Sequence, residues 1–543
     1  MVPQDYIPTQ MPTLTVNTRD AKACQEVVAS LPLTSVSTAH GMLKALLQAM
    51  KKAPPPAIGY LAVLESAREP LAFLQDALAE RYAAKPLPAR AEETAAFERT
   101  IELWRLMADS YAQVARIGGG DAEIQKRLAL ICQRCVHYAG RIVDEHFRGH
   151  RALANGVWIE LHGYEDTAQE WGLASEKVSE PLGSAGGTTT ANATFGAVLL
   201  VSLANPYSRT AKELAWIHRW AELLAPETDV RPPNADVGGR GYGIDLMRDQ
   251  GPLPVENIAS TPSARLFDTS RLTQRLQEIM ARLKEGEAPA ALGLGEDCQT
   301  PQAVRLLRQL YRPWCLAAMP RRFQRNRASG TIAAAYDMDS IYFHVAGNDF
   351  AQPQHARSYS AVDIDRIVTF RNQLDPTKPL QMHSSQLGIH LDTWDVADQS
   401  VHGLRVFRDA AGPRIEHGQL LAFKEEASDR FRLGRISWLV QEKDGRLQAG
   451  IHVLTDAARG VAVRPTGLAV SKGERYLPAF LLPAEPAIKE PLSVLVPANW
   501  YQPGRVVEVF TDRSIMLRLD ELLDRGPNFD RCTFSLVTPA TSA

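Results

Sequence analysis

The hydrophobic pattern of this chain changes its period part-way along the sequence. Up to about Tyr311, apolar residues recur at every third or fourth position, which is the period of an amphipathic helix. Beyond Pro320, short strand-like apolar runs follow one another between turn residues. We therefore expect the fold to split near residue 300. The predicted fold class is α+β and multidomain, with an N-terminal α-helical bundle, an antiparallel β-barrel and a further C-terminal β domain.

Two apolar stripes give the clearest helices. The first lies within Ala91 to Arg116, and the second follows Asp121, a residue that can cap a helix. Because only a short glycine loop separates them, the two helices should pack antiparallel. We interpret the helical region as a structural or docking bundle that contacts a protein partner. The stripes are Phe97, Ile101, Trp104, Met107, Tyr111 and Val114, then Ile124, Leu128, Ile131, Cys135, Tyr138 and Ile142.

The strand-rich half contains a cluster of polar side chains in the segment Asp398-Gln399-Ser400-Val401-His402-Gly403. Strand-like runs at 389–397 and 404–407 flank this segment. Because side chains alternate along a strand, Asp398 and Ser400 should point the same way. Gly403 permits a turn or the close approach of a ligand to the backbone. The same pattern also fits a plain turn between strands, and the residues alone leave both interpretations open.

Four arginines lie upstream, between Pro320 and Arg327. A guanidinium can bond phosphate through two N–H groups, bond the O6/N7 edge of guanine, or stack on a base. An aspartate can accept from the N–H groups on the other edge of guanine. Arginines together with the Asp398 and Ser400 cluster therefore suit a ligand that contains both guanine and phosphate.

Arg321-x-x-x-Arg325 followed by Asp398-x-Ser400-x-x-Gly403 resembles the paired signature of PilZ domains, the bacterial receptors for cyclic di-GMP. The runs 434–438 and 449–454 resemble the closing hairpin of that barrel, so the resemblance covers roughly residues 311–454. It implies a PilZ-like β-barrel and cyclic di-GMP as the ligand. The implied ligand-binding residues are Arg321, Arg322, Arg325, Asp398, Ser400 and Gly403.

The spacing of the two motif halves departs from the family, because they lie farther apart than usual. An insertion is therefore expected within Val345 to Leu380. A near-copy of the second half, His383 to Gly388, has His in place of the acid and is the second candidate.

Four domains are expected from these patterns. They are a helical bundle with an N-terminal arm (1–230), a Pro/Gly-rich linker with short helices (231–310), the PilZ-like barrel with its insertion (311–460) and a C-terminal β extension (461–543). The implied function is a signalling receptor that couples nucleotide binding to a change in domain packing or partner binding. The alternative is a PilZ-like scaffold that binds no nucleotide and acts through protein contacts.

Composition excludes several other classes of function. The net charge of −2 gives no global field that would recruit nucleic acid or an anionic membrane. The longest largely apolar run, Phe195 to Ala204, is about half the length of a membrane helix. With six cysteines in 543 residues and no signal-peptide pattern at the N-terminus, we expect a cytoplasmic protein.

Catalytic and metal motifs are also missing from the sequence. It contains neither His-Glu-x-x-His nor Gly-x-Ser-x-Gly, so no enzyme activity and no cofactor are expected. Cys132 and Cys135 lack a second pair of ligands nearby, and we expect core cysteines there rather than a zinc site. His146 and His150 share a helical spacing without a third ligand and are expected to be solvated.

Overall fold

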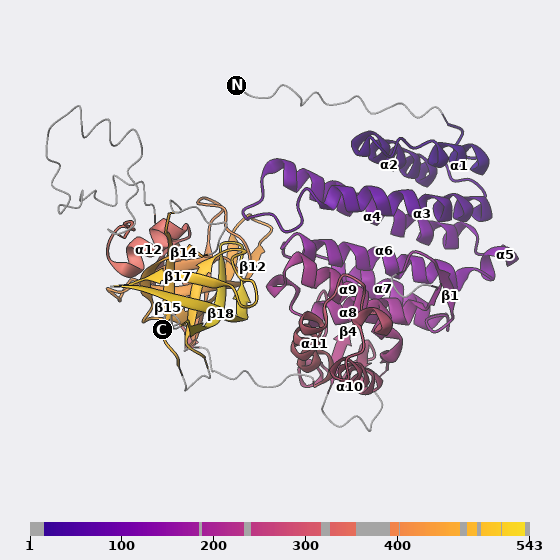
Figure 1. The fold of residues 1–543 in the computed structure, drawn as a ribbon. Coiled ribbons are helices and arrows are strands. Elements are labelled where there is room, and N and C mark those ends of the chain that lie inside the picture. Colours follow the sequence, from indigo (N-terminus) through magenta and orange to yellow (C-terminus); the bar gives the residue numbers. More distant parts are fainter. Residues whose placement is uncertain are drawn as a thin grey trace, which may run out of the picture. The chain divides into compact units, whose positions relative to one another are not determined.

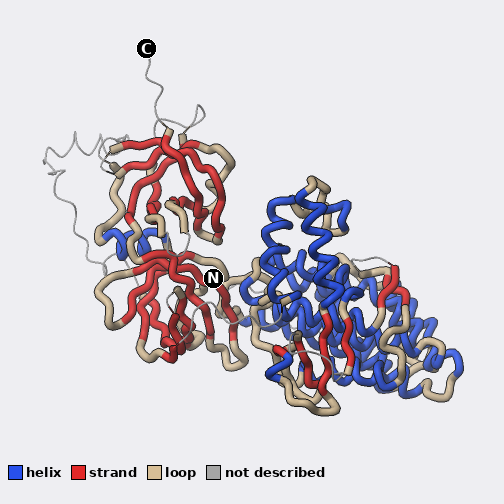
Figure 2. Tube along the Cα trace, turned by 90° about the horizontal axis from the view of Figure 1, so that it is seen from below, coloured by secondary structure: helices blue, strands red, loops and turns tan. Residues whose placement is uncertain are grey.

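The computed structural model describes residues 16–183, 187–232, 241–316, 326–353, 391–400, 402–466, 475–485, 490–511 and 513–537. The chain divides into two compact units, here called the helical unit and the barrel unit (Figure 1). The helical unit comprises residues 1–321 without Pro86–Pro88, and the barrel unit comprises Pro86–Pro88 and residues 322–543. Helices dominate the first and strands the second (Figure 2), which confirms the expected α+β multidomain class.

The helical unit begins with helices that pack around one hydrophobic core. The run Pro54–Pro56 separates the second and third helices, because proline cannot continue a helix. The helices of this part are α1 (Ala21–Ala29), α2 (Val36–Lys52), α3 (Ala57–Ala79), α4 (Ala91–Ile117), α5 (Ala122–Gln125), α6 (Leu128–Arg148), α7 (Val157–Glu170), α8 (Ala191–Leu203) and α9 (Ala211–Leu224).

The first predicted apolar stripe lies on α4, and the second begins with Ile124 on α5 and continues along α6. Every member of the first stripe is buried, and so is every member of the second except the half-buried Leu128. Asp121 caps the one-turn helix α5 rather than α6, with its Oδ1 accepting from the Glu123 N–H at 2.8 Å. The helical periodicity therefore identified the faces that build this core.

Residues 242–315 carry regular structure in place of the expected linker. They contribute three strands of a four-stranded sheet, in the order β3-β6-β4-β5, and two amphipathic helices. The apolar faces of these helices belong to the same core as the bundle, so the segment is part of the helical unit. The elements are β3 (Asp229–Arg231), β4 (Tyr242–Asp245), β5 (Leu253–Pro254), β6 (Ala264–Asp268), α10 (Ser270–Lys284) and α11 (Thr300–Cys315); a separate two-stranded ribbon pairs β1 (Val178–Glu180) with β2 (Gly187–Thr189).

The first barrel of the barrel unit closes on itself through six strands in the order β8-β9-β10-β13-β12-β11, with β7 added beside β9. All of its strand pairs are antiparallel. Helix α12 (Met338–Ala346) follows β8. The strands are β7 (Asn326–Arg327), β8 (Thr331–Ala335), β9 (Asp392–Ser400), β10 (Gly403–Arg408), β11 (Leu420–Glu425), β12 (Arg432–Gln441) and β13 (Leu447–Thr455).

A second closed barrel follows, in the order β14-β15-β16-β19-β18-β17. The two barrels share an apolar cluster that includes Ile341 of α12, Leu420 of β11 and Phe529 of β19. Asn528 links them further, because its Oδ1 accepts from the Leu420 N–H at 2.9 Å. The strands are β14 (Arg459–Pro465), β15 (Leu477–Leu482), β16 (Ser493–Pro497), β17 (Val506–Phe510), β18 (Ser514–Arg525) and β19 (Phe529–Leu536).

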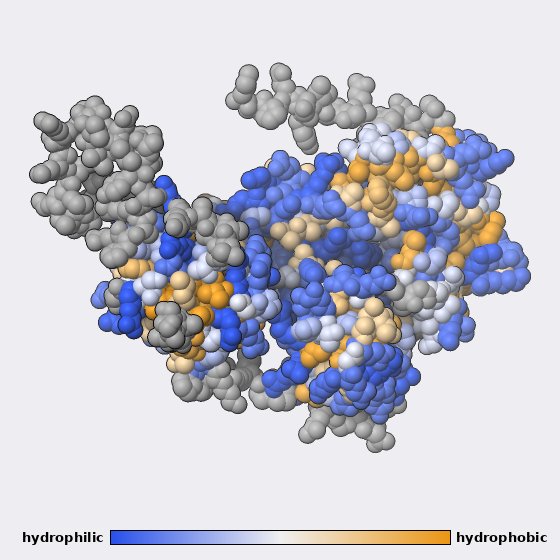
Figure 3. Space-filling view, viewed as in Figure 1, coloured by the Kyte–Doolittle hydropathy of each residue, from blue (hydrophilic) through white to orange (hydrophobic). Residues whose placement is uncertain are grey.

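Apolar and hydrophilic residues are interspersed on the face seen in Figure 3. Individual large apolar side chains are exposed, such as Phe73 on α3 and Met247 after β4. Among the helices that the structure describes, none has the length and apolar character needed to cross a membrane.

Candidate functional site

Asp398 and Ser400 lie at the end of strand β9, on the same face. Opposite β10, the register shifts by one residue between Arg405 and Val406, which makes Ala397 the extra residue of a β-bulge. Without the bulge, Asp398 would share the inward face of the buried Trp394. The bulge therefore turns Asp398 away from the barrel interior.

A short hairpin follows, in which Ser400 of β9 pairs with Gly403 of β10. The Ser400 hydroxyl donates a hydrogen bond to the Gly403 carbonyl at 3.2 Å. Gly403 is buried, and a Cβ added there would lie 3.1 Å from the carbonyl oxygen of Ile451 in β13. The glycine therefore permits close approach of a neighbouring strand.

Two arginines flank Asp398 across the sheet. Arg405 of β10 and Arg327 of β7 are its direct partners on either side, so all three side chains share one face. The Arg405 Nε lies 2.8 Å from the Asp398 Oδ2, and the Arg405 side chain is 47% exposed. The Arg327 residue is exposed. The result is a row of cation, anion and cation on the outside of the barrel.

Three of the predicted ligand-binding residues, Arg321, Arg322 and Arg325, lie outside the described residues. The next residue, Asn326, begins β7 and pairs with Gln399 of β9. The described chain after the arginine segment therefore joins the barrel directly beside the strand that carries Asp398. The near-copy at 383–388 also lies outside the described residues.

Arg405 is a site residue that the sequence analysis missed, although a signal was present. In a hairpin closed by Ser400 and Gly403, the residue opposite Asp398 is necessarily Arg405. Recognising the turn as a two-residue loop would have identified this ion pair.

Most of the insertion expected within Val345 to Leu380 lies outside the described residues, since the structure does not describe residues 354–390. The described part of the interval between β8 and β9 includes helix α12, which ends at Ala346. Asp337 caps α12, with its Oδ1 accepting from the Ser340 N–H at 2.9 Å.

Cys132 and Cys135 are buried in the core of the helical unit, as expected, and burial raises the pKa of both thiols. The prediction that His146 is solvated was wrong, because the residue is only 3% exposed. Its Nδ1 lies 2.8 Å from the Ile142 carbonyl, and its Nε2 accepts from the Ala154 N–H at 3.3 Å. His146 therefore helps to join the end of α6 to the following loop.

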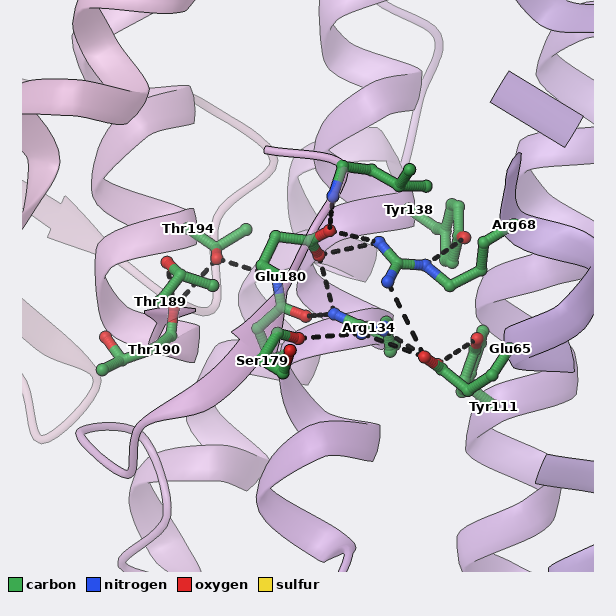
Figure 4. Close-up of polar contacts among 12 residues, drawn as sticks. Glu65, Arg68, Tyr111, Arg134, Tyr138, Ser179, Glu180, Thr189, Thr190 and Thr194 are labelled. Atoms are coloured by element: carbon green, nitrogen blue, oxygen red, sulfur yellow. Dashed lines mark hydrogen bonds and ion pairs between the residues drawn. The ribbon is translucent and has the colours of Figure 1, made fainter. Parts of the chain in front are cut away.

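A second polar centre, here called the ionic cluster, lies inside the helical unit and consists of Glu65, Arg68, Arg134 and Glu180 (Figure 4). Arg134 is 1% exposed and bridges both acids, with its Nη1 2.7 Å from Glu180 Oε2 and its Nε 2.9 Å from Glu65 Oε1. The Arg68 Nη2 lies 2.6 Å from Glu180 Oε1. Each charge of the cluster therefore has an opposite charge beside it, and Arg68, Arg134 and Glu180 are buried.

The local environment keeps Glu65 ionised within this cluster. Burial by itself would raise the pKa of the Glu65 carboxyl, but the bonds from Arg134 and the Tyr111 hydroxyl hold it below its usual value. The cluster joins α3, α6 and the ribbon strand β1 across long stretches of sequence. No local sequence motif predicted it.

Comparison with known proteins gives matches in both units. Residues 22–234 match the family model described as the cyclic-di-GMP receptor FimW, N-terminal domain, and residues 461–537 match the FimW C-terminal beta-barrel domain. The chain resembles FimW in two separate segments. The cyclic-di-GMP receptor FimW of Pseudomonas aeruginosa is 22% identical over 399 residues, which is 66% of this chain and 64% of that protein.

The segment from Asp398 to Gly403 lies between the two regions that match FimW family models. Those matches therefore concern the helical unit and the second barrel, whereas the ligand residues expected in the first barrel rest on their sequence pattern and on the geometry of β7, β9 and β10.

Proposed function

We propose that this protein is a cyclic di-GMP receptor and that its first barrel is the PilZ-like ligand-binding domain. The observation that carries the proposal is the pairing of β7 with β9. It brings Asn326 and Arg327, which directly follow Arg325, beside the strand of Asp398 and Ser400, despite the long interval between them in sequence. The similarity to the FimW receptor supports the same ligand class.

In the proposed site, arginines and polar residues of β9 would contact different groups of the ligand. Arg321, Arg322 and Arg325 would contact the phosphates and the guanine O6/N7 edge. Asp398 would accept from the N–H groups of guanine, which requires its carboxylate to share or exchange the bond from Arg405. Ser400 would add a hydrogen bond. Binding would then change the packing of the domains or the contact of the helical bundle with a protein partner.

Calorimetric titration of the full chain with cyclic di-GMP tests the proposal. The wild type should bind, and Arg325→Ala should weaken binding by about one to two decades, since a good bidentate arginine contact is worth roughly 1–3 kcal/mol. Asp398→Ala should also reduce the preference for guanine.

The matched control is Arg446→Ala. Arg446 lies in the hairpin between β12 and β13, at the other end of the β10–β13 pair from Gly403. Its loss should leave the affinity unchanged. No heat of binding for the wild type at high micromolar ligand would favour the scaffold that binds no nucleotide. Equal affinity of the wild type and both site variants would place the ligand elsewhere.

A further inference from the structure

Helix α4 forms the floor of a groove of about 400 Å³ on the helical unit, here called the α4 groove. Phe97, Ile101 and Leu106 supply apolar side chains to this floor, and Leu106 is half-buried. His146 closes one end, where its ring packs edge-on against Phe97 at a centroid distance of 5.1 Å. Asp109 lines the other end. The α4 groove therefore follows the helix for about 18 Å, at the helical rise of about 1.5 Å per residue.

Ion pairs to α2 and α7 balance most of the charged side chains along the rim of the α4 groove. The pairs are Glu102 Oε2 with Lys44 Nζ at 2.7 Å, Asp109 Oδ2 with Lys51 Nζ at 2.5 Å, and Arg105 Nε with Glu160 Oε2 at 3.4 Å. Glu98, the other acid of the lining, is exposed to solvent. Because these charges need no counter-charge from an occupant, the α4 groove suits a segment with little charge of its own.

The chain enters the helical unit near the Asp109 end of this groove. Val16, the first described residue, packs against the core of the helical unit. The Thr18 hydroxyl donates a hydrogen bond to the carbonyl of Ala53, the residue that follows α2, at 2.8 Å. The last turn of α2 also holds Lys51, which pairs with Asp109. The residues before Val16 therefore begin close to the place where the groove begins.

Residues 1–15, here called the N-terminal segment, lie outside the described residues, and their sequence matches the groove. Asp5 is the one charged side chain of this segment, and its large apolar side chains include Ile7, Met11 and Leu14. Its three prolines disfavour a helix and favour an extended backbone at the residue before each ring. Fifteen extended residues span about 50 Å, so the segment is long enough to follow the whole groove.

We propose that the N-terminal segment docks in the α4 groove of its own chain. Five extended residues cover about 16 Å, so Leu14 and Met11 would lie over the part of α4 that contains Leu106. Burial of these apolar side chains against the floor would favour docking. Arg105, whose side chain is 43% exposed, would donate to backbone carbonyls that an extended segment leaves unpaired. This interaction lies within the helical unit and is independent of the nucleotide site proposed for the first barrel.

Photocrosslinking in the full chain tests the proposal. Met11→p-benzoylphenylalanine places a light-activated group in the N-terminal segment and changes none of the described residues. After irradiation, mass spectrometry should find crosslinks from position 11 to residues 97–109 of α4. A mixture of isotope-labelled and unlabelled chains shows whether a crosslink joins one chain or two, and we expect crosslinks within one chain.

Two variants weaken the expected contact, one from each side. Leu106→Glu places a charge on the floor of the groove, and Leu14→Ser removes an apolar side chain from the segment itself. Each should lower the crosslink yield about tenfold, because the docked state loses the burial of one leucine. The matched controls are Phe73→Glu, at an exposed apolar residue of α3 outside the lining, and Thr13→Ser in the segment. Neither control should change the yield.

Circular dichroism of each variant shows whether the helical unit is still folded. If Leu106→Glu does not fold, Leu14→Ser decides the test, because it changes none of the described residues. Crosslinks from position 11 only to other parts of the chain, crosslinks that join two chains, or a yield that neither folded variant lowers would each overturn the proposal.

Discussion

At the scale of single residues, buried acids determine how the helical unit responds to pH. Glu165 of α7 is fully buried, and its Oε2 has no hydrogen-bond partner within the described part of the chain. Burial raises the pKa of its carboxyl to about 8, and Asp166 adds to the effect, whereas Gln169 and Arg265 oppose it. In the folded protein, Glu165 therefore holds a proton that the unfolded chain has already released near pH 7.

This proton predicts the direction in which the stability of the helical unit changes with pH. Because the pKa in the folded state is raised, the contribution of Glu165 to stability is complete below about pH 4.5 and is lost as the pH rises through about 8. Glu165→Gln should therefore stabilise the helical unit increasingly over this range, by roughly 2–4 kcal/mol at the alkaline end. Urea unfolding followed by circular dichroism at about pH 5 and about pH 9 measures the difference.

The control for this prediction is Glu170→Gln, which changes an exposed acid on the same helix. It should shift the unfolding free energy little at either pH. A stabilisation by Glu165→Gln that is the same at both pH values would contradict the raised pKa.

The candidate site shows how far single residues can be read from sequence. The common face of Asp398 and Ser400 was predictable from strand alternation, and the structure confirms it. Which face they share was not, because the bulge at Ala397 reverses the alternation after Trp394. Asp144 and His218 lie on helices α6 and α9, and only the packed fold brings the Asp144 Oδ2 and the His218 Nδ1 to 3.6 Å from each other.

At the scale of elements, the pairing of β12 with β13 depends on a glycine beneath a tryptophan. Trp438 pairs with Gly450 across the two strands, and a Cβ added at Gly450 would collide with the indole ring. Gly450→Ala should therefore displace the ring and destabilise the first barrel by about 1–3 kcal/mol. Chemical denaturation of the barrel unit measures this cost.

A double-mutant cycle with Trp438→Ala is the control for the predicted cost of Gly450→Ala. If the cost arises from the collision, Gly450→Ala should cost clearly less in a Trp438→Ala background. An equal cost in both backgrounds would assign the effect to the backbone of β13 instead.

The elements that were predicted correctly are those with a long and regular period. Helices α4 and α6 show their stripes over many turns. The strands of the small sheet, β3 to β6, have two to five residues each, which is too short for a period to be distinguished from Pro/Gly-rich loop sequence. Strand β18 continues as far as Arg525, because its neighbour β19 pairs with Leu522, Asp524 and Arg525.

At the scale of the whole molecule, each unit has a hydrophobic core of its own. The core of the helical unit extends from Cys24 to Trp314, and the clusters of the barrel unit begin at Ile341. The two regions that match FimW family models fall one in each unit. Stability and ligand response should therefore be separable between the units.

Scanning calorimetry of the full chain should accordingly show two unfolding transitions. Gly450→Ala should lower the midpoint temperature of one transition, and that transition then belongs to the barrel unit. Cyclic di-GMP should raise the midpoint temperature of the same transition, because a ligand at 100 times its Kd stabilises the folded state by about 2.7 kcal/mol. GMP, which lacks the second guanine and the cyclic phosphates, is the control and should raise it much less. A rise in the other transition would place the nucleotide in the helical unit, and a single transition would mean that the two cores unfold as one.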